Sequence, residues 1–171
     1  MIIITGAGKG KTTTALGEAL RFCLNGKKVL ILQFIKGARV SGEFKAAKKL
    51  GPNFVIKPMG LGFVRFASGE KKAEHQAAAH KAVQAAQESI LSGAYDLIVL
   101  DELLYSIGFG LIQMEDVIAD LLKPKPKHLT LILTGRNAPP ELVDLADYVI
   151  EAQGLKHPFK QGIPAQVGIE F

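Results

Sequence analysis

A loop rich in glycine and lysine near the amino terminus restricts what this chain can fold into more than any other feature. Residues 4–13 read ITGAGKGKTT, between an apolar run and a segment with helical periodicity from Thr12 to Leu24. In such a loop, glycines let backbone N–H groups turn inward, the helix N-terminus adds partial positive charge, and Lys11 adds a full positive charge. The order of strand, loop and helix therefore predicts a nest for the phosphates of a nucleotide.

The spacing within this loop is unusual. Gly6 and Gly10 enclose three residues, whereas the common phosphate-loop pattern has four between its first glycine and its Gly-Lys-Thr. Lys9 supplies a second cation, and Thr12 stands where a hydroxyl is expected to bind Mg²⁺. The shortening indicates that the phosphates lie differently from those in a standard nucleotide hydrolase.

Beyond the loop, apolar runs rich in β-branched residues alternate with segments of helical periodicity. The expected strands are Ile2 to Ile4, Val29 to Phe34, Leu97 to Leu100, Leu129 to Leu133 and Tyr148 to Ile150. The expected helices are Thr12 to Leu24, Gly42 to Leu50, Glu70 to Leu91, Met114 to Leu122 and Pro140 to Ala146. This alternation is typical of an α/β fold with a mostly parallel sheet and helices on both faces. We expect the least regular structure in Lys57 to Gly69 and from Gly154 onward, which are rich in Gly and Pro.

An acidic pair follows the apolar run from Leu97 to Leu100. Ligands of α/β sheets bind beyond the carboxyl ends of the strands, so Asp101 or Glu102 is placed to reach a metal ion or its water shell. An acidic pair after a strand is also a common helix cap. The loop upstream favours the metal-binding interpretation.

Two further segments carry candidate ligand-binding residues. Residues 134–140 read TGRNAPP after an expected strand, so Arg136 and Asn137 either face the ligand edge or form a turn that leads into a helix. His157 is the one histidine that we consider as functional. A structural hydrogen bond that holds the tail is the alternative for that residue.

Composition narrows the class of protein. The 171 residues, 48% of them hydrophobic, suffice for the core of one domain, which we expect to span residues 1–171. No segment approaches the roughly 20 apolar residues of a membrane span, and the amino terminus lacks a signal-peptide pattern, so we expect a cytoplasmic protein that does not enter a membrane. The net charge of +5 favours an anionic ligand such as a nucleoside triphosphate. The basic residues are scattered, so we do not expect a nucleic-acid site, and the spacing of the histidines gives no transition-metal site.

Eight short sequence words together point to a family. They are GAGKGKTT, VLILQFIKG, GE, GLGF, YDLIVLDEL, LTGRNAPPEL, LADYV and KHPFKQGIPAQVGIEF, in this order. From about Ile4 to Phe171 the chain resembles the phosphate-loop family of ATP:corrinoid adenosyltransferases of the cobalamin pathway. The resemblance implies a single-domain P-loop (RecA-like) fold.

The resemblance also implies an unusual use of ATP. In this family, the Co(I) of a reduced corrinoid attacks the 5′ carbon of ATP, the adenosyl group moves to cobalt, and the whole triphosphate leaves. The shortened loop would then hold the nucleotide in the opposite sense to ordinary phosphate-loop enzymes and bind a leaving group. Because cobalt is the nucleophile, no general base is required, and Lys11 and Glu102 would only support catalysis.

The resemblance assigns site residues by position. Those expected to bind ATP are Thr5, Gly6, Ala7, Gly8, Lys9, Gly10, Lys11, Thr12, Thr13 and Arg21. Those expected to bind Mg²⁺ are Thr12, Asp101 and Glu102, and those expected to bind the corrinoid are Phe63 and Arg65. Core packing for Phe63 and a solvated side chain for Arg21 are the alternatives. The implied partners are ATP, the corrinoid, a flavoprotein electron donor and a second copy of the chain in a homodimer.

The chain departs from the family pattern at three places. The family commonly has Gly-Phe-Thr-Trp where this chain has Gly62 to Arg65, and it often has Asn at the position of Ala7. Many relatives also carry a segment before the first strand, whereas here Met1 almost touches it. Two other functions stay open. The same loop and the net charge of +5 also fit a RecA-like NTPase stimulated by nucleic acid, and Arg65 with the missing leading segment fits a regulator that binds ATP without turnover.

Overall fold

A six-stranded sheet forms the centre of the molecule. The computed structural model describes residues 1–37, 42–62, 68–156 and 166. In chain order, the elements are β1 (Ile2–Thr5), α1 (Lys11–Leu24), β2 (Val29–Gln33), α2 (Gly42–Leu50), β3 (Phe54–Pro58), α3 (Glu70–Leu91), β4 (Leu97–Asp101), α4 (Leu103–Gly108), α5 (Met114–Val117), the π-helical η1 (Ile118–Leu122), β5 (Thr130–Thr134), α6 (Pro140–Asp144) and β6 (Tyr148–Glu151). The strand order is β3-β2-β4-β5-β1-β6, and every pairing between these strands is parallel. The predicted α/β class is confirmed.

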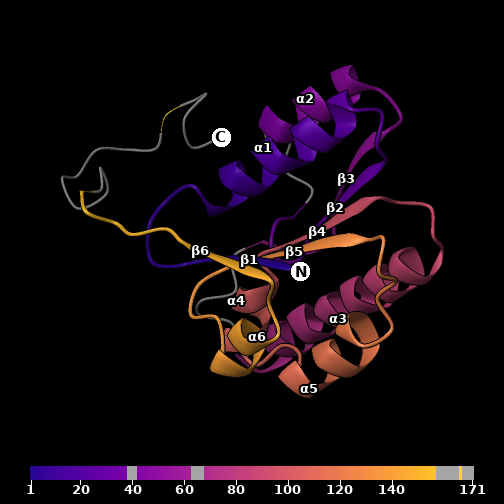
Figure 1. Cartoon of the computed structure of the whole chain (residues 1–171). Coiled ribbons are helices and arrows are strands. Elements are labelled where there is room, and N and C mark those ends of the chain that lie inside the picture. The colour runs from indigo at the N-terminus through magenta and orange to yellow at the C-terminus, as the bar shows by residue number, and fades with distance from the viewer. Residues whose placement is uncertain (38–41, 63–67, 157–165, 167–171) are drawn as a thin grey trace.

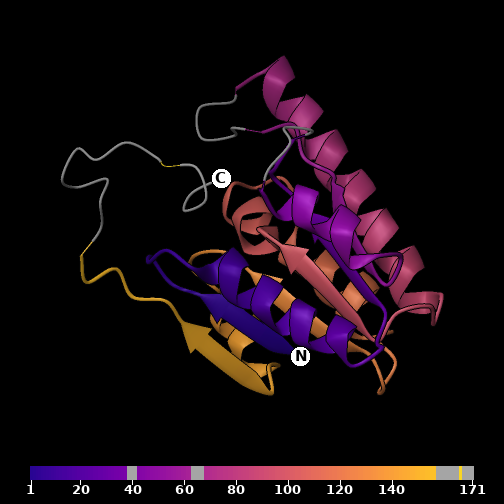
Figure 2. The same cartoon turned by 90° about the horizontal axis from the view of Figure 1, so that it is seen from above.

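Helices cover both faces of the sheet. Helices α1 and α2 lie on one face, and α3, α4, α5 and α6 lie on the other (Figure 1). The view from above shows the same sheet with α1 running along it beside β1 (Figure 2). This arrangement places the loop before α1 at the carboxyl edge of the strands, where ligands of such folds bind.

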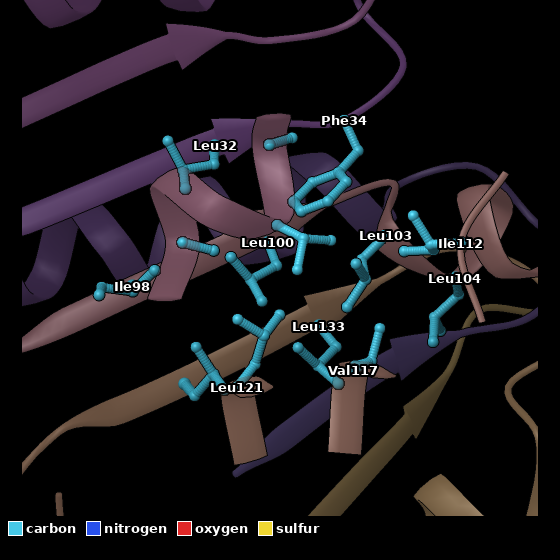
Figure 3. Packing of buried hydrophobic residues seen from close by; sticks show 14 of the residues in the cluster. Leu32, Phe34, Ile98, Leu100, Leu103, Leu104, Ile112, Val117, Leu121 and Leu133 are labelled. Carbon is cyan, nitrogen blue, oxygen red and sulfur yellow. The ribbon is translucent and has the colours of Figure 1, made fainter. Parts of the chain in front are cut away.

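Alternation along the central strands divides the core into two clusters. On β2, Leu30 and Leu32 face the α3 side, whereas Val29 and Ile31 face α1 and α2. Figure 3 shows the larger cluster, to which β2 contributes Leu32 and to which β4, β5, α4, α5 and η1 contribute further apolar side chains. Because a parallel sheet is buried on both faces, its central strands β2 and β4 carry apolar runs that a polar residue ends, Gln33 and Asp101 respectively, and the sequence predicted these apolar runs.

Two elements were missed by the sequence prediction. Strand β3 (Phe54–Pro58) was not expected, and the predicted irregular segment from Lys57 wrongly included its last two residues. A five-residue strand that ends in Lys-Pro at the edge of the sheet gives a weak pattern, since proline is tolerated there. Helix α4 (Leu103–Gly108) was also missed, because six residues are too few to show helical periodicity.

A smaller difference concerns the helix that follows α4. The helix predicted from Met114 to Leu122 begins as α5 and continues as the π-helical η1.

In the part of the chain that the structure describes, no helix has the length and apolar character needed to cross a membrane.

Candidate active site

The phosphate-loop candidate packs tightly against the chain that follows β6. The Gly8 N–H donates to the Ala152 carbonyl oxygen over 2.7 Å, and a Cβ on Gly8 would lie 2.7 Å from the same oxygen. Gly6 and Gly10 adopt positive φ angles of 102° and 108°, which side chains other than glycine rarely adopt. Gly6 and Gly10 therefore allow the loop to turn, and Gly8 allows its backbone to approach the backbone of Ala152 closely.

Lys11 folds back onto this loop. Its Nζ donates to the carbonyl oxygens of Gly6 over 2.8 Å and of Gly8 over 2.6 Å. Burial, followed by the positive charge of Arg136, lowers the pKa of Lys11, while the Glu102 and Asp101 carboxylates act in the opposite direction. An anionic group in the nest would oppose both effects, because it would supply a counter-charge to the partly buried ammonium group.

Polar side chains end three neighbouring strands on the face that carries α1 and α2. Gln33 of β2 pairs in register with Asp101 of β4, and Thr134 ends β5 beside them. Each of the three stands two positions after a residue of the α1–α2 core cluster, and alternate residues of a strand share a face. Strand periodicity therefore brings the three side chains to the base of the loop.

Asp101 is the centre of a hydrogen-bond network there. Its Oδ1 accepts from the hydroxyls of Thr12 over 2.9 Å and Thr134 over 2.7 Å. Its Oδ2 accepts from Gln33 Nε2 over 3.3 Å. Asp101 is fully buried, so these donors replace the water that its carboxylate loses on folding. The network fixes Thr12, and with it the first turn of α1, against β4 and β5.

Glu102, the next residue, lies in a different environment. It has a φ of 64°, and its N–H donates to the Thr134 hydroxyl over 2.9 Å. The buried Oε2 of its side chain has no hydrogen-bond partner among the described residues. Burial, then the Asp101 charge, raises the pKa of Glu102 to about 7, although Lys36 and Lys11 oppose the shift. Glu102 is therefore a mostly buried acid whose side-chain Oε2 lacks a hydrogen-bond partner among the described residues and whose charged form is disfavoured despite two nearby lysines.

A second pair of charges lies on the β2 side. Lys36 Nζ donates to Glu43 Oε1 over 2.6 Å, and Gln33 Nε2 lies 3.4 Å from the same oxygen. Lys36 follows β2 and Glu43 lies in the first turn of α2. The pair links these two elements at the edge of the site.

A cavity of about 650 Å³ joins these groups. Its size falls within the range of small-molecule sites, roughly 300–1,000 Å³. Its polar lining residues are Lys9, Lys11, Thr12, Thr13, Lys36, Glu43, Glu102, Tyr105, Thr134 and Arg136. Its apolar part lies along α1, α2 and the start of β3 and is lined by Leu16, Leu20, Ala46, Leu50 and Phe54. The cavity thus offers a cationic, hydrogen-bonding part and an apolar part to one ligand.

An aromatic stack borders the cavity on the α4 side. The Tyr105 and Phe109 rings stack with centroids 5.8 Å apart, and the Arg136 guanidinium lies 6.0 Å from the Tyr105 ring centroid. Burial raises the pKa of Tyr105, as does the Glu102 charge, while Arg136 opposes the shift. Arg136 therefore lines the cavity, and its contact with a ligand stays a prediction.

Other predicted site residues are placed elsewhere. The Thr5 hydroxyl accepts from the Ala138 N–H over 3.2 Å. Asn137 has a φ of 53° in the turn before α6, which agrees with the interpretation of that segment as a turn that leads into a helix. Arg21 is exposed, lies 3.1 Å from Glu18 and does not line the cavity. Phe63, Arg65 and His157 lie outside the described residues.

The sequence prediction assigned no role to five polar residues of this site. They are Gln33, Lys36, Glu43, Tyr105 and Thr134. The signal for Gln33 and Thr134 was a polar residue at the end of an apolar strand, in phase with Asp101. Lys36 and Glu43 gave no such signal, because their pairing depends on how α2 returns to β2.

No multi-ligand metal centre is built into the described residues. Among them, no group of three or more His, Cys, Asp or Glu side chains could hold a metal ion. The unpartnered Glu102 oxygen and the Thr12 hydroxyl are nevertheless oxygen donors next to the loop, and Mg²⁺ is commonly bound by one or two protein oxygens together with phosphates and waters.

Comparisons with known proteins agree on one family. The whole chain, residues 1–171, matches the family model described as ATP:corrinoid adenosyltransferase BtuR/CobO/CobP. A corrinoid adenosyltransferase of Escherichia coli K12 is 36% identical over 171 residues, and the corrinoid adenosyltransferase CobA of Salmonella typhimurium is 38% identical over 172 residues. Each alignment covers 100% of this chain and 85% of the relative. A corrinoid adenosyltransferase of a Sinorhizobium species is 36% identical, with 79% of its length covered.

Proposed function

The chain belongs to the ATP:corrinoid adenosyltransferase family, and on this premise we propose that it transfers the 5′-deoxyadenosyl group of ATP to the Co(I) of a reduced corrinoid. The whole-chain family match is the observation that carries the proposal. The cationic nest at the base of a cavity supports it, since that nest suits the triphosphate of the donor. The activity belongs to cobalamin biosynthesis or salvage.

The reaction is a displacement at carbon. The electron pair of Co(I) forms the cobalt–carbon bond, the C5′–O5′ bond breaks, and its electron pair leaves with the triphosphate. No proton has to be removed, so the chain needs no general base. Its contribution is to align the ribose carbon and to stabilise the negative charge that grows on the leaving group, for which Lys11 and the loop N–H groups are suited.

Thr12 and Glu102 are the groups proposed to hold Mg²⁺ with the triphosphate. Both are oxygen donors, and the buried Oε2 of Glu102 lacks a partner among the described residues. The ion would neutralise part of the charge of the leaving group. Asp101 was predicted as a third ligand, but its oxygens already accept from three side chains, so we assign it the task of holding Thr12 in place.

The corrinoid side of the proposal depends on the family resemblance. The roles of Phe63, Arg65 and His157 stay predictions, as does the nucleotide contact of Arg21. The homodimer, the flavoprotein electron donor, the cytoplasmic location and the extent of one domain over residues 1–171 stay predictions as well. Sedimentation of the purified chain tests the dimer directly.

The product spectrum tests the proposed function. The protein is incubated with MgATP and chemically reduced cobalamin or cobinamide, and we expect a light-sensitive alkyl-cobalt spectrum together with one free triphosphate per adenosyl group. Release of ADP and phosphate, above all if DNA stimulates it, would contradict the proposal in favour of an NTPase. Tight ATP binding without any corrinoid-dependent product would instead support a regulator.

A further inference from the structure

Lys36 is a second, partly buried cation of the cavity, and in the strand order it lies on the side opposite the loop. It follows β2, two strands away from β5 and three from β1, whereas Lys11 begins α1 directly after the loop that follows β1. Its side chain is 34% exposed and lines the cavity. Burial alone would lower the pKa of Lys36, but the hydrogen bond to Glu43 and the charges of Asp101, Glu43 and Glu102 outweigh burial and raise it. Lys36 is therefore a firmly charged ammonium group within the field of the Glu102 carboxylate.

A series of hydrogen-bonded side chains, which starts at the buried Asp101, sets the position of this ammonium group. Asp101 accepts from Gln33, Gln33 also lies within hydrogen-bond distance of Glu43, and Glu43 holds the ammonium group over 2.6 Å. Glu43 is only 14% exposed. The same network that fixes Thr12 on one side of the cavity thus fixes Lys36 on the other.

From this geometry we infer that Lys36 binds a phosphate group of the nucleotide, and that Glu43 holds the ammonium group in place until the phosphate replaces it as the partner. This contact would add to those of the loop, because Lys36 reaches the cavity from the segment after β2. The identity of the anion as ATP or its triphosphate rests on the proposed function. The binding step itself requires only a polyphosphate.

Charge balance around the cavity supports this assignment. Among the described residues that line it, the cationic side chains are Lys9, Lys11, Lys36 and Arg136, and the carboxylates are Glu43 and Glu102. If Glu102 is bound to Mg²⁺, only Glu43 remains to balance the cations from within the lining. A polyphosphate would balance this excess of cations, and when Lys36 turns to the phosphate, Gln33 Nε2 remains within 3.4 Å of Glu43 Oε1.

The competing interpretation is a purely structural ion pair that ties α2 to β2. The two interpretations differ in what happens when each partner is removed separately. A phosphate-binding Lys36 makes Lys36→Met harmful and Glu43→Gln neutral or favourable for polyphosphate binding, since Glu43 competes with the phosphate. A structural tie makes both substitutions equally harmful, because either one breaks the same contact.

Calorimetric titration with Mg²⁺-tripolyphosphate tests the inference on the full chain. We expect Lys36→Met to raise Kd by about tenfold to a hundredfold, the usual effect of losing a hydrogen bond to a charged group. Glu43→Gln should leave Kd within about threefold of wild type or lower it, and Lys36→Arg should restore most of the affinity. Lys49→Met removes an exposed lysine of α2 that does not line the cavity, and it should leave Kd unchanged.

Several results would overturn the inference. Equal weakening by Lys36→Met and Glu43→Gln would show a structural tie, and wild-type affinity in Lys36→Met would show that the ammonium group does not touch the phosphates. Absence of tripolyphosphate binding by the wild-type chain would contradict it as well. Thermal unfolding of each variant shows whether it is folded. Because the titration contains no corrinoid, failure of adenosyl transfer in the product assay would leave a Lys36-dependent Kd intact and would count against the proposed function alone.

Discussion

Two sets of polar groups meet near the carboxyl ends of the central strands, and they differ in whether their side chains are hydrogen-bonded to one common acceptor. The first set, the floor network, comprises Gln33, Thr12, Asp101 and Thr134, whose side chains are joined by hydrogen bonds to Asp101. The second set, the ligand-facing groups, comprises Lys11, Lys36 and Glu102, which line the cavity.

The contrast is sharpest between two neighbouring residues. Asp101 is fully buried and accepts from three donors, whereas Glu102 keeps a buried oxygen without a partner among the described residues. Buried polar groups cost free energy unless they are paired. The floor network therefore stabilises the fold, and Glu102 is a group whose missing partner a ligand is expected to supply. Substitutions in the two sets should accordingly affect different measurements.

The largest effect is expected for Lys11→Ala. This change removes the full charge from the phosphate nest, and we expect kcat/KM for adenosyl transfer to fall on the order of a thousandfold, about 4 kcal/mol of transition-state stabilisation. The free energy of unfolding should change far less, because burial already disfavours the charged form of Lys11 in the ligand-free protein. Urea denaturation and steady-state kinetics measure the two quantities. If Lys11→Ala lowered the free energy of unfolding by as much as it lowered transition-state stabilisation, the proposed difference between the two sets would be wrong.

Asp101→Ala should act in the opposite way, mainly on stability. It leaves the Thr12 and Thr134 hydroxyls and the Gln33 amide without their common acceptor, which we expect to cost about 3–4 kcal/mol of unfolding free energy. Urea denaturation measures the loss. A change below about 1 kcal/mol would mean that water or rearranged side chains replace the network.

The pH dependence of stability should identify Glu102. Its pKa is about 7 in the folded protein and 4.5 ordinarily, so between these values the native state binds more protons than the unfolded state. Stability should therefore fall as the pH rises from about 4.5 to 7, by up to roughly 3 kcal/mol at 1.36 kcal/mol per pKa unit. Glu102→Gln should abolish this fall and should lower adenosyl transfer at the same time. Saturating MgATP should also abolish it in the wild-type protein.

The smallest effect is expected for a residue of neither set. The Ser106 hydroxyl on α4 is fully buried and has no hydrogen-bond partner among the described residues. Ser106→Ala removes an unpaired polar atom, so the unfolding free energy should rise by about 0.5–1 kcal/mol while adenosyl transfer stays unchanged. A loss of stability would indicate that the hydroxyl has a partner such as a bound water. Ser106→Ala is therefore the control with which the stability and activity of the Lys11, Asp101 and Glu102 variants are compared.

Sequence reasoning located the loop side of the site well and the β2 side poorly. The glycines, Lys11, Thr12 and the acidic pair are close together or end a strongly apolar strand, so their pattern is visible within short stretches. Lys36 and Glu43 also lie near one another in the chain, but their contact depends on α2 packing against the sheet. Asp101 and Glu102 were likewise given the same metal-binding role, because the face on which each side chain lies depends on where β4 ends.

The sequence by itself determined the alternation of strands and helices, the position of the anion nest and the family, since these follow from local periodicity and from motifs read along the chain. Only the tertiary structure decided which of two adjacent carboxylates is saturated, and that Lys36 reaches the same cavity as Lys11. The physical reason is that hydrogen bonding and desolvation act between neighbours in space, and the order β3-β2-β4-β5-β1-β6 makes neighbours of residues that lie far apart in the chain.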